Sequence, residues 1–144
     1  MLLCEAKSKI KQISALELFF ANESVWVGYH SEKAYWLIEF QENDTCGEIY
    51  RRVMEDILSF LNFRPTSKII IDQSKKSFFR AEDVLWAWQS WLPLFGKCLG
   101  QNGKMAMILP PSKFAFIEKA SFRIIPFQNK VFTTRKEAES WLLA

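Results

Sequence analysis

The sequence predicts an α/β domain on a mixed β-sheet, with an N-terminal antiparallel meander followed by parallel β–α units and packed helices. Runs of β-branched and aromatic residues dominate positions 16–40. Further along the chain, short uninterrupted apolar runs alternate with segments of helical periodicity. Such alternation favours crossover connections and a largely parallel sheet, whereas the closely spaced early runs favour hairpins.

The first third of the chain contains three predicted strands. They cover Leu16–Phe20, Val25–His30 and Ala34–Phe40, and they are rich in residues that fit a pleated, half-buried surface. Short polar segments separate them, so a meander is the simplest arrangement.

The periodicity becomes helical from Thr45. Thr45 and Glu48 have the spacing of a capping box, in which each side chain satisfies a backbone N–H of the first helical turn. Arg64-Pro65 is predicted to end this helix. Its apolar residues fall on one stripe, which comprises Cys46, Ile49, Tyr50, Val53, Ile57, Phe60 and Leu61.

The next unit is a central strand followed by a long helix. Ser67–Asp72 is a β-branched run of the kind that both faces of a sheet cover. After a loop over Gln73–Phe79, a helix is predicted from about Arg80 to Leu99, which Pro93 should kink or interrupt. Its predicted core face consists of Val84, Leu85, Trp88, Trp91, Leu92 and Phe95.

The last units are a second buried strand over Lys104–Leu109 and a third over Asn129–Thr133. Pro110 opens a short predicted helix that reaches about Ala120, and Phe122–Ile125 is ambiguous. Thr134 and Glu137 form a second capping box. A terminal helix is expected there, with Ala138, Trp141 and Leu142 packing inward.

Composition sets the limits on function. The chain has 144 residues, 49% of them hydrophobic, and a net charge of +3. We expect an N-terminal arm over 1–14 and a single domain over 15–144. The small, dispersed charge does not indicate binding to nucleic acid. The sequence has neither a transmembrane run nor a signal peptide, so we expect a cytoplasmic protein.

The residues of the sequence give little support for catalysis or for a metal site. Cys4, Cys46 and Cys98 are far apart and form no CxxC pair, which indicates reduced thiols, the last two partly buried. His30 is the only histidine, so a transition-metal site and a histidine-based nucleophile are both unexpected. The glycines form no dinucleotide-binding or phosphate-binding loop. We therefore expect no cofactor and no enzymatic activity.

Several segments together resemble a known family. The chain has a meander, a strand that ends in Asp72, a Trp-rich helix with W-L-P near its end (Trp86–Pro93), and a strand that runs into Pro110. It closes with Val131–Phe132 and E-A-E-S-W-L from Glu137. This pattern resembles the SpoIIAA-like (STAS-like) small bacterial proteins, which are related in shape to anti-sigma-factor antagonists. The resemblance implies the fold over about residues 16–144, but fold does not fix function.

The departure from that family concerns phosphorylation. Anti-sigma-factor antagonists carry an Asp-Ser-Ser-Gly stretch whose serine is phosphorylated by a partner kinase. The corresponding segment here reads DQSKKSFFR from Asp72. Ser74 and Ser77 lie in the right region but outside any such motif, so phosphorylation is not implied.

Three candidate sites follow. The first is the loop after the central strand, where open α/β sheets bind ligands and where backbone amides favour anions. Its residues Asp72, Ser74, Lys75, Lys76, Ser77 and Arg80 suit a phosphate or an acidic partner, unless the loop is only a solvated connector.

The second candidate is Trp86, which projects on the polar side of its helix and is either an exposed anchor for a partner or covered by a neighbouring loop or the N-terminal arm. The third is an apolar pocket around Met107, Phe114 and Phe116, for which a filled core is the alternative.

The leading hypothesis is a non-catalytic regulatory or protein-interaction domain that docks a protein partner or a second copy. The alternative is a carrier or sensor of a lipid or another small apolar ligand.

Overall fold

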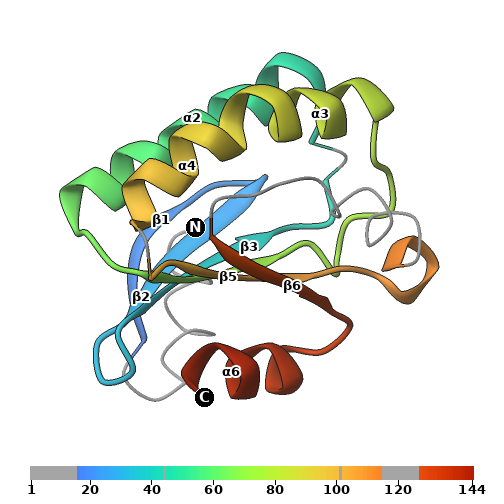
Figure 1. Cartoon of the computed structure of the whole chain (residues 1–144). Helices are drawn as coiled ribbons and strands as arrows, with labels where there is room; N and C mark the ends of the chain where they lie inside the picture. Colours follow the sequence, from blue (N-terminus) through green and yellow to red (C-terminus); the bar gives the residue numbers. More distant parts are fainter. Residues whose placement is uncertain (1–15, 44, 101, 115–126) are drawn as a thin grey trace.

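Six strands form a mixed sheet in which neighbours in space are also neighbours in sequence, in the order β1-β2-β3-β4-β5-β6 (Figure 1). A computed structural model describes residues 16–43, 45–100, 102–114 and 127–144. The arm expected over 1–14 therefore lies outside the described residues.

The meander is confirmed. β1 (Leu16–Ala21), β2 (Val25–His30) and β3 (Tyr35–Phe40) pair in antiparallel fashion. Asn22 holds the first turn, because its side-chain oxygen accepts two 2.8 Å hydrogen bonds from backbone N–H groups of that turn.

The parallel part is also confirmed. β3 pairs with β4, β4 with β5, and β5 with β6, all in parallel. The three later strands are β4 (Lys68–Asp72), β5 (Lys104–Ile108) and β6 (Gln128–Phe132). The mixed α/β class predicted from the sequence is therefore present.

Helices cover both faces of the sheet. α2 (Gly47–Phe63) and the segment after β4 lie on one face, and α6 (Arg135–Leu143) lies on the other (Figure 1). Successive β4 side chains alternate between the two hydrophobic clusters. Ile69 and Ile71 belong to the cluster under α2, and Ile70 belongs to the cluster over α6. All three are fully buried, and each contributes about 1.5–3 kcal/mol through burial.

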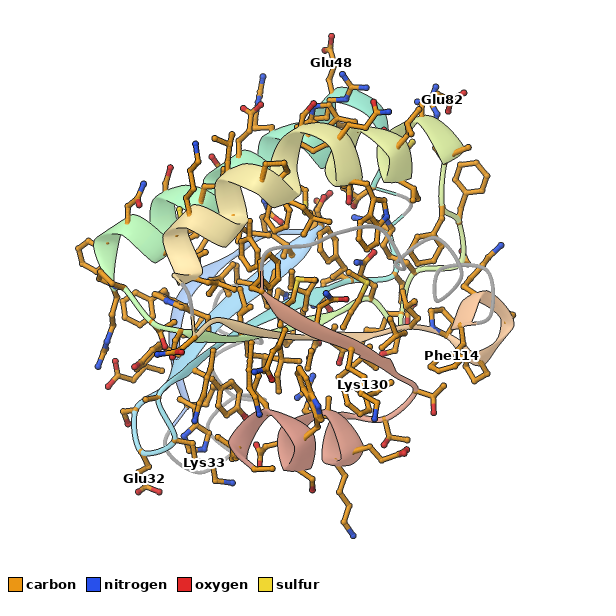
Figure 2. The ribbon with its side chains drawn as sticks, viewed as in Figure 1. Glu32, Lys33, Glu48, Glu82, Phe114 and Lys130 are labelled. Atoms are coloured by element: carbon orange, nitrogen blue, oxygen red, sulfur yellow. The ribbon has the colours of Figure 1, made fainter. Side chains whose placement is uncertain are left out.

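The start of α2 differs from the prediction. Cys46 is the N-cap, and no side chain caps it. The Thr45 hydroxyl bonds to the carbonyl of Asn43, and Glu48 points outward (Figure 2). The predicted capping box of Thr45 and Glu48 is therefore wrong. The backbone N–H of Gly47 instead donates to the carboxylate of Asp83 at 2.9 Å.

Most of the predicted stripe of α2 is buried. Tyr50, Val53, Ile57 and Leu61 are buried as expected, and Cys46 and Phe60 are half-buried. Met54, which was not predicted, is also buried. Ile49 was predicted to belong to the stripe, but it is 63% exposed. Because each residue turns the helix by about 100°, Ile49 lies to one side of the row that Tyr50 begins.

The long helix over 80–99 is divided into three segments. α3 (Ala81–Trp86) and α4 (Leu92–Leu99) flank η1 (Ala87–Trp91), which is a turn of π-helix. Pro93 is the second residue of α4, close to the predicted interruption, because proline has no N–H to bond to the preceding turn.

The π turn explains an error in the predicted core face. Trp91, Leu92 and Phe95 are buried as expected, but Leu85 is 55% exposed. Trp86, for which both an exposed and a covered side chain were predicted as alternatives, is half-buried and packs against the core. A wider turn shifts the residues before it relative to those after it, so one continuous 100° projection misplaces them.

The terminal helix begins as predicted. The Thr134 side chain accepts a hydrogen bond from the Glu137 N–H, and its hydroxyl bonds to the Glu137 carboxylate at 2.8 Å. Ala138 and Leu142 are fully buried, and Trp141 is half-buried against Phe132. Residues 111–114 are helical, as expected, whereas 122–125 lie outside the described residues.

Candidate functional site

A pocket lies at the carboxyl ends of β4 and β5, beneath α3 and η1. Its volume is about 40 Å³, enough for about three water molecules. Open α/β sheets bind ligands in the crevice at the carboxyl ends of their strands. The residues that line this β4–β5 pocket are Tyr50, Met54, Ile71, Gln73, Lys76, Phe79, Arg80, Asp83, Val84, Ala87, Trp88, Trp91, Leu92, Met107 and Leu109.

The apolar wall of the pocket includes the π turn. Ala87, Trp88 and Trp91 of η1 all line it, and the Trp91 indole N–H donates to the carbonyl of Met54 at 2.6 Å. This hydrogen bond ties the turn to α2. Single π turns inside helices are frequent at functional sites, and this one places two indole rings around the cavity.

The predicted apolar pocket is only partly in place. Met107 lines the β4–β5 pocket. Phe114 packs against the same small hydrophobic cluster as Met107 and lies just past the end of β5 (Figure 2). Phe116 lies outside the described residues.

Lys76 is buried at the polar end of the pocket. Only 3% of the residue is exposed, and its Nζ donates to the carbonyl of Thr45 at 3.1 Å. The Nζ also lies 5.3 Å from the ring centroid of Phe40, 4.7 Å from that of Tyr50 and 4.8 Å from that of Phe79. These three rings, called the aromatic cage below, are within cation–π range of the ammonium.

Asp83 is the acidic residue of the pocket. Its carboxylate accepts the Gly47 N–H at 2.9 Å, so it satisfies the start of α2 from another helix. Gly47 has φ +61°, which suits glycine, since other residues rarely adopt it. Burial, and then the charge of Asp83, raises the pKa of the Tyr50 hydroxyl, so this hydroxyl stays protonated.

Two buried polar groups face the pocket without protein partners. Gln73 is 5% exposed and Tyr50 is 6% exposed. Within the described part of the chain, neither the Gln73 amide nor the Tyr50 hydroxyl makes a hydrogen bond. Their polar atoms are not among the fully enclosed, unpartnered side-chain atoms of the described residues, so they keep contact with solvent and are available to a ligand or to water.

A second polar cluster lies on the opposite face, against α6. The Arg135 guanidinium contacts the carboxylates of Glu39 and Asp72, the latter at 2.9 Å. Lys75 Nζ is 2.8 Å from Glu39, and the Ser74 hydroxyl donates to Asp72 at 2.6 Å. We call Arg135, Glu39 and Asp72 the α6 clamp.

Ion pairing outweighs burial in setting the pKa values of Glu39 and Arg135 in this clamp. Burial alone would raise the pKa of Glu39, but its hydrogen bonds to Lys75 and Arg135 and their charges outweigh it, and the pKa is lowered. Burial likewise opposes the charge of Arg135, yet the two carboxylates raise its pKa. The clamp is therefore an ion-paired attachment of α6 to the sheet.

The middle of α6 is attached in a similar way. Glu139 accepts from Lys33 Nζ and from the Tyr35 hydroxyl, both at 2.6 Å. His30 is buried, stacks on Tyr35, and accepts the Lys33 N–H through Nδ1 at 3.2 Å. The single histidine is thus part of the fold and lies outside the β4–β5 pocket.

The predicted loop site is divided between the two faces. Asp72, Ser74 and Lys75 lie together on the α6 side. Arg80 lines the pocket on the other side and is paired with Glu82 at 3.6 Å, while Ser77 is exposed. These residues therefore do not form one anion site.

Trp86 is not a freely exposed anchor. It packs edge-on against Tyr50, with centroids 6.2 Å apart, and the Arg51 guanidinium lies 5.3 Å from its ring centre. Of the two predicted alternatives, the covered ring is the one observed, and the segment that covers it is α2.

Lys76 belongs to the loop that the sequence predicted as a site, whereas Tyr50, Gln73 and Asp83 were not predicted as site residues. Tyr50 was assigned to the buried stripe of its helix. One signal was available: Gln73 directly follows a buried strand, where α/β ligand sites form. The convergence of the four depends on long-range packing, which no local pattern contains.

Metal, membrane and family comparisons add no assignment. Among the described residues, no group of three His, Cys, Asp or Glu side chains has the arrangement to hold a metal ion, and Cys46 and Cys98 are half-buried free thiols. In the same part of the chain, no helix combines the length and apolar character needed to cross a bilayer. No protein-family model matches the chain, and no curated protein matches it significantly.

Proposed function

We propose that this chain is a non-catalytic regulatory domain that senses a compact, largely apolar ligand in the β4–β5 pocket. The observation that carries the proposal is the pair of buried polar groups, Gln73 and Tyr50, that line an apolar cavity without protein partners. An apolar pocket with a few convergent polar groups is the usual form of a small-molecule site. The polar pair would orient the ligand, and the indole and methionine walls would cover its apolar part.

Size favours a compact ligand over a lipid. The cavity of about 40 Å³ is far below the roughly 300–1,000 Å³ of sites that enclose drug-sized molecules. An entire acyl chain would require the helices to move apart. The hypothesis that the chain senses a small ligand is thus better supported than the hypothesis that it carries a lipid.

Binding is favoured over catalysis by the residues of the pocket. Its described lining contains no serine, threonine, cysteine or histidine, the common nucleophiles and general bases. The two strongest charges are already engaged, Lys76 with the Thr45 carbonyl and Asp83 with the Gly47 N–H.

The resemblance to SpoIIAA-like proteins also supports a regulatory role, because these proteins are related in shape to anti-sigma-factor antagonists. Antiparallel strands followed by β–α units agree with the fold that the resemblance implies. The segment from Asp72 lacks the phosphorylation motif, so regulation through a ligand is the version that this chain's residues support.

Docking of a protein partner is the second candidate. Phe78 and Leu85 are about half exposed, and each is adjacent in sequence to a pocket-lining residue. If this edge docks a second copy, sedimentation at increasing concentration should reveal self-association that Phe78→Ser abolishes. A monomer at all concentrations would remove the self-association version.

The ligand proposal is tested with phenol and benzamide as probes in ¹H–¹⁵N NMR titrations. We expect at least one probe to shift the Gln73 side-chain amide and to raise the melting temperature. Val84→Phe, which fills the pocket wall, should abolish binding. Its matched control is Leu85→Phe, at an exposed position on the same helix.

Gln73→Leu separates binding from stability. It should weaken benzamide binding but leave the free energy of unfolding unchanged or raise it by up to about 1 kcal/mol, because an unpartnered amide is removed. If neither probe shifts any pocket residue, or if Val84→Phe binds as well as wild type, the proposal is wrong.

A further inference from the structure

The aromatic cage around Lys76 has the chemistry of a cation site. Phe40 comes from β3, Tyr50 from α2 and Phe79 from the loop before α3, and their ring centroids lie 4.7–5.3 Å from Nζ. Each ring presents negative π density to a cation. The carbonyl oxygen of Thr45, at 3.1 Å, supplies a hydrogen-bond acceptor.

The wider pocket adds to this preference for a cation. Asp83 places a carboxylate in the lining, the Tyr50 hydroxyl and the Gln73 amide oxygen can accept hydrogen bonds, and Arg80 is the other cation of the lining, paired with Glu82. A ligand anion in the cage would face ring faces and a carbonyl oxygen, all of which disfavour it.

We propose that the aromatic cage binds the ammonium group of a small alkyl- or arylamine, and that Lys76 is the resident cation that this amine displaces. The inference rests on the proposed function, since it names the class of ligand that the β4–β5 pocket accepts. It also makes Lys76 a built-in competitor that sets the amine concentration required for binding.

The position of Lys76 permits its side chain to be displaced. The residue lies in the connection between β4 and α3, outside strand and helix, and its backbone N–H donates to the Gln73 carbonyl at 3.1 Å. Its four-carbon stem is flexible, and its ammonium is strongly hydrated once it reaches water. Exchange of one ammonium for another leaves the charge inside the cage unchanged.

The test compares n-propylammonium chloride with 1-propanol and sodium propionate on wild type, Lys76→Ala and Lys75→Ala. Lys75 is the adjacent residue and is bound to Glu39 on the other face, so Lys75→Ala removes the same charge without touching the cage. Calorimetric titrations are run at equal ionic strength.

We expect Lys76→Ala to bind n-propylammonium at least about tenfold more tightly than wild type or Lys75→Ala, and about tenfold more tightly than it binds 1-propanol. The affinity for propionate should be no higher in Lys76→Ala than in wild type. The proposal is overturned if 1-propanol binds Lys76→Ala as well as the amine does. It is equally overturned if propionate binds wild type and Lys76→Ala abolishes that binding, because Lys76 would then be an anion ligand.

A wild-type measurement covers the case in which Lys76→Ala does not fold. With ¹⁵N-lysine labelling, saturating n-propylammonium should shift the Nζ signal that is absent from Lys76→Arg, whereas an unmoved signal contradicts displacement. If phenol or benzamide binds the pocket but no amine enters the cage, this inference fails and the proposed function stands. If no probe binds at all, both fail.

Discussion

On the α6 face of the sheet, charged side chains pair with one another, whereas on the α2 face polar side chains surround a cavity. Glu39 and Asp72 share Arg135, and Glu139 binds both Lys33 and Tyr35. The side chains of the buried residues Gln73 and Tyr50 make no hydrogen bond within the described part of the chain. The comparison separates polar groups that hold the fold together from polar groups that remain open to a ligand.

The largest effect is expected from breaking the α6 clamp. Arg135→Met leaves two mostly buried carboxylates without their shared cation, and we expect the free energy of unfolding to fall by about 3 kcal/mol. Urea denaturation measures it, with Lys136→Met at the adjacent exposed position as the control. A loss below about 0.5 kcal/mol would mean that the clamp contributes nothing and that the contrast between the faces is false.

A smaller loss is expected on the other face from Trp86→Ala. The half-buried indole contacts Tyr50 and Arg51, so its removal should cost about 2 kcal/mol. Leu85→Ala, one residue earlier and exposed, should change stability by less than about 0.5 kcal/mol. Equal effects of the two variants would show that Trp86 is a surface residue after all.

The smallest effect is expected in the stability of the protein at acidic pH. The pKa of Glu39 is lowered in the folded protein, so its contribution to stability is present above the ordinary glutamate pKa and is lost as pH falls through the lowered value. Glu39→Gln should therefore flatten the decline of unfolding free energy between pH 5 and 3. The Gln73→Leu variant on the pocket face should decline as wild type does. Identical acid profiles for all three proteins would contradict this assignment.

Features that depend on residues close together in the sequence were predicted correctly, whereas features that depend on residues far apart in the sequence were not. Thr134 caps the helix that follows it, because the hydroxyl and the Glu137 N–H are three residues apart. The same pattern at Thr45 and Glu48 failed, since Asp83, from another helix, takes the Gly47 N–H. Local spacing thus identified the strands and most helix boundaries but could not reveal a competitor supplied by tertiary packing.

The candidate site was less predictable for the same reason. Lys75 and Lys76 are identical neighbours in sequence, yet one bonds to Glu39 on the α6 face and the other enters the aromatic cage. Irregular backbone has no fixed period, so nothing local assigns their directions. The π turn had a similar effect, because it shifted the phase of Leu85 and Trp86 in a way that the standard helical angle does not describe.

The linear order of the strands has a consequence for how the molecule is made. Each strand after the first joins the edge that the preceding strand has just formed, so no strand must insert between two that are already paired. Pairing can therefore proceed outward from the β1–β2 hairpin, one strand at a time, in the order of synthesis. α6 follows all six strands in the sequence, and its docking covers one face of the sheet.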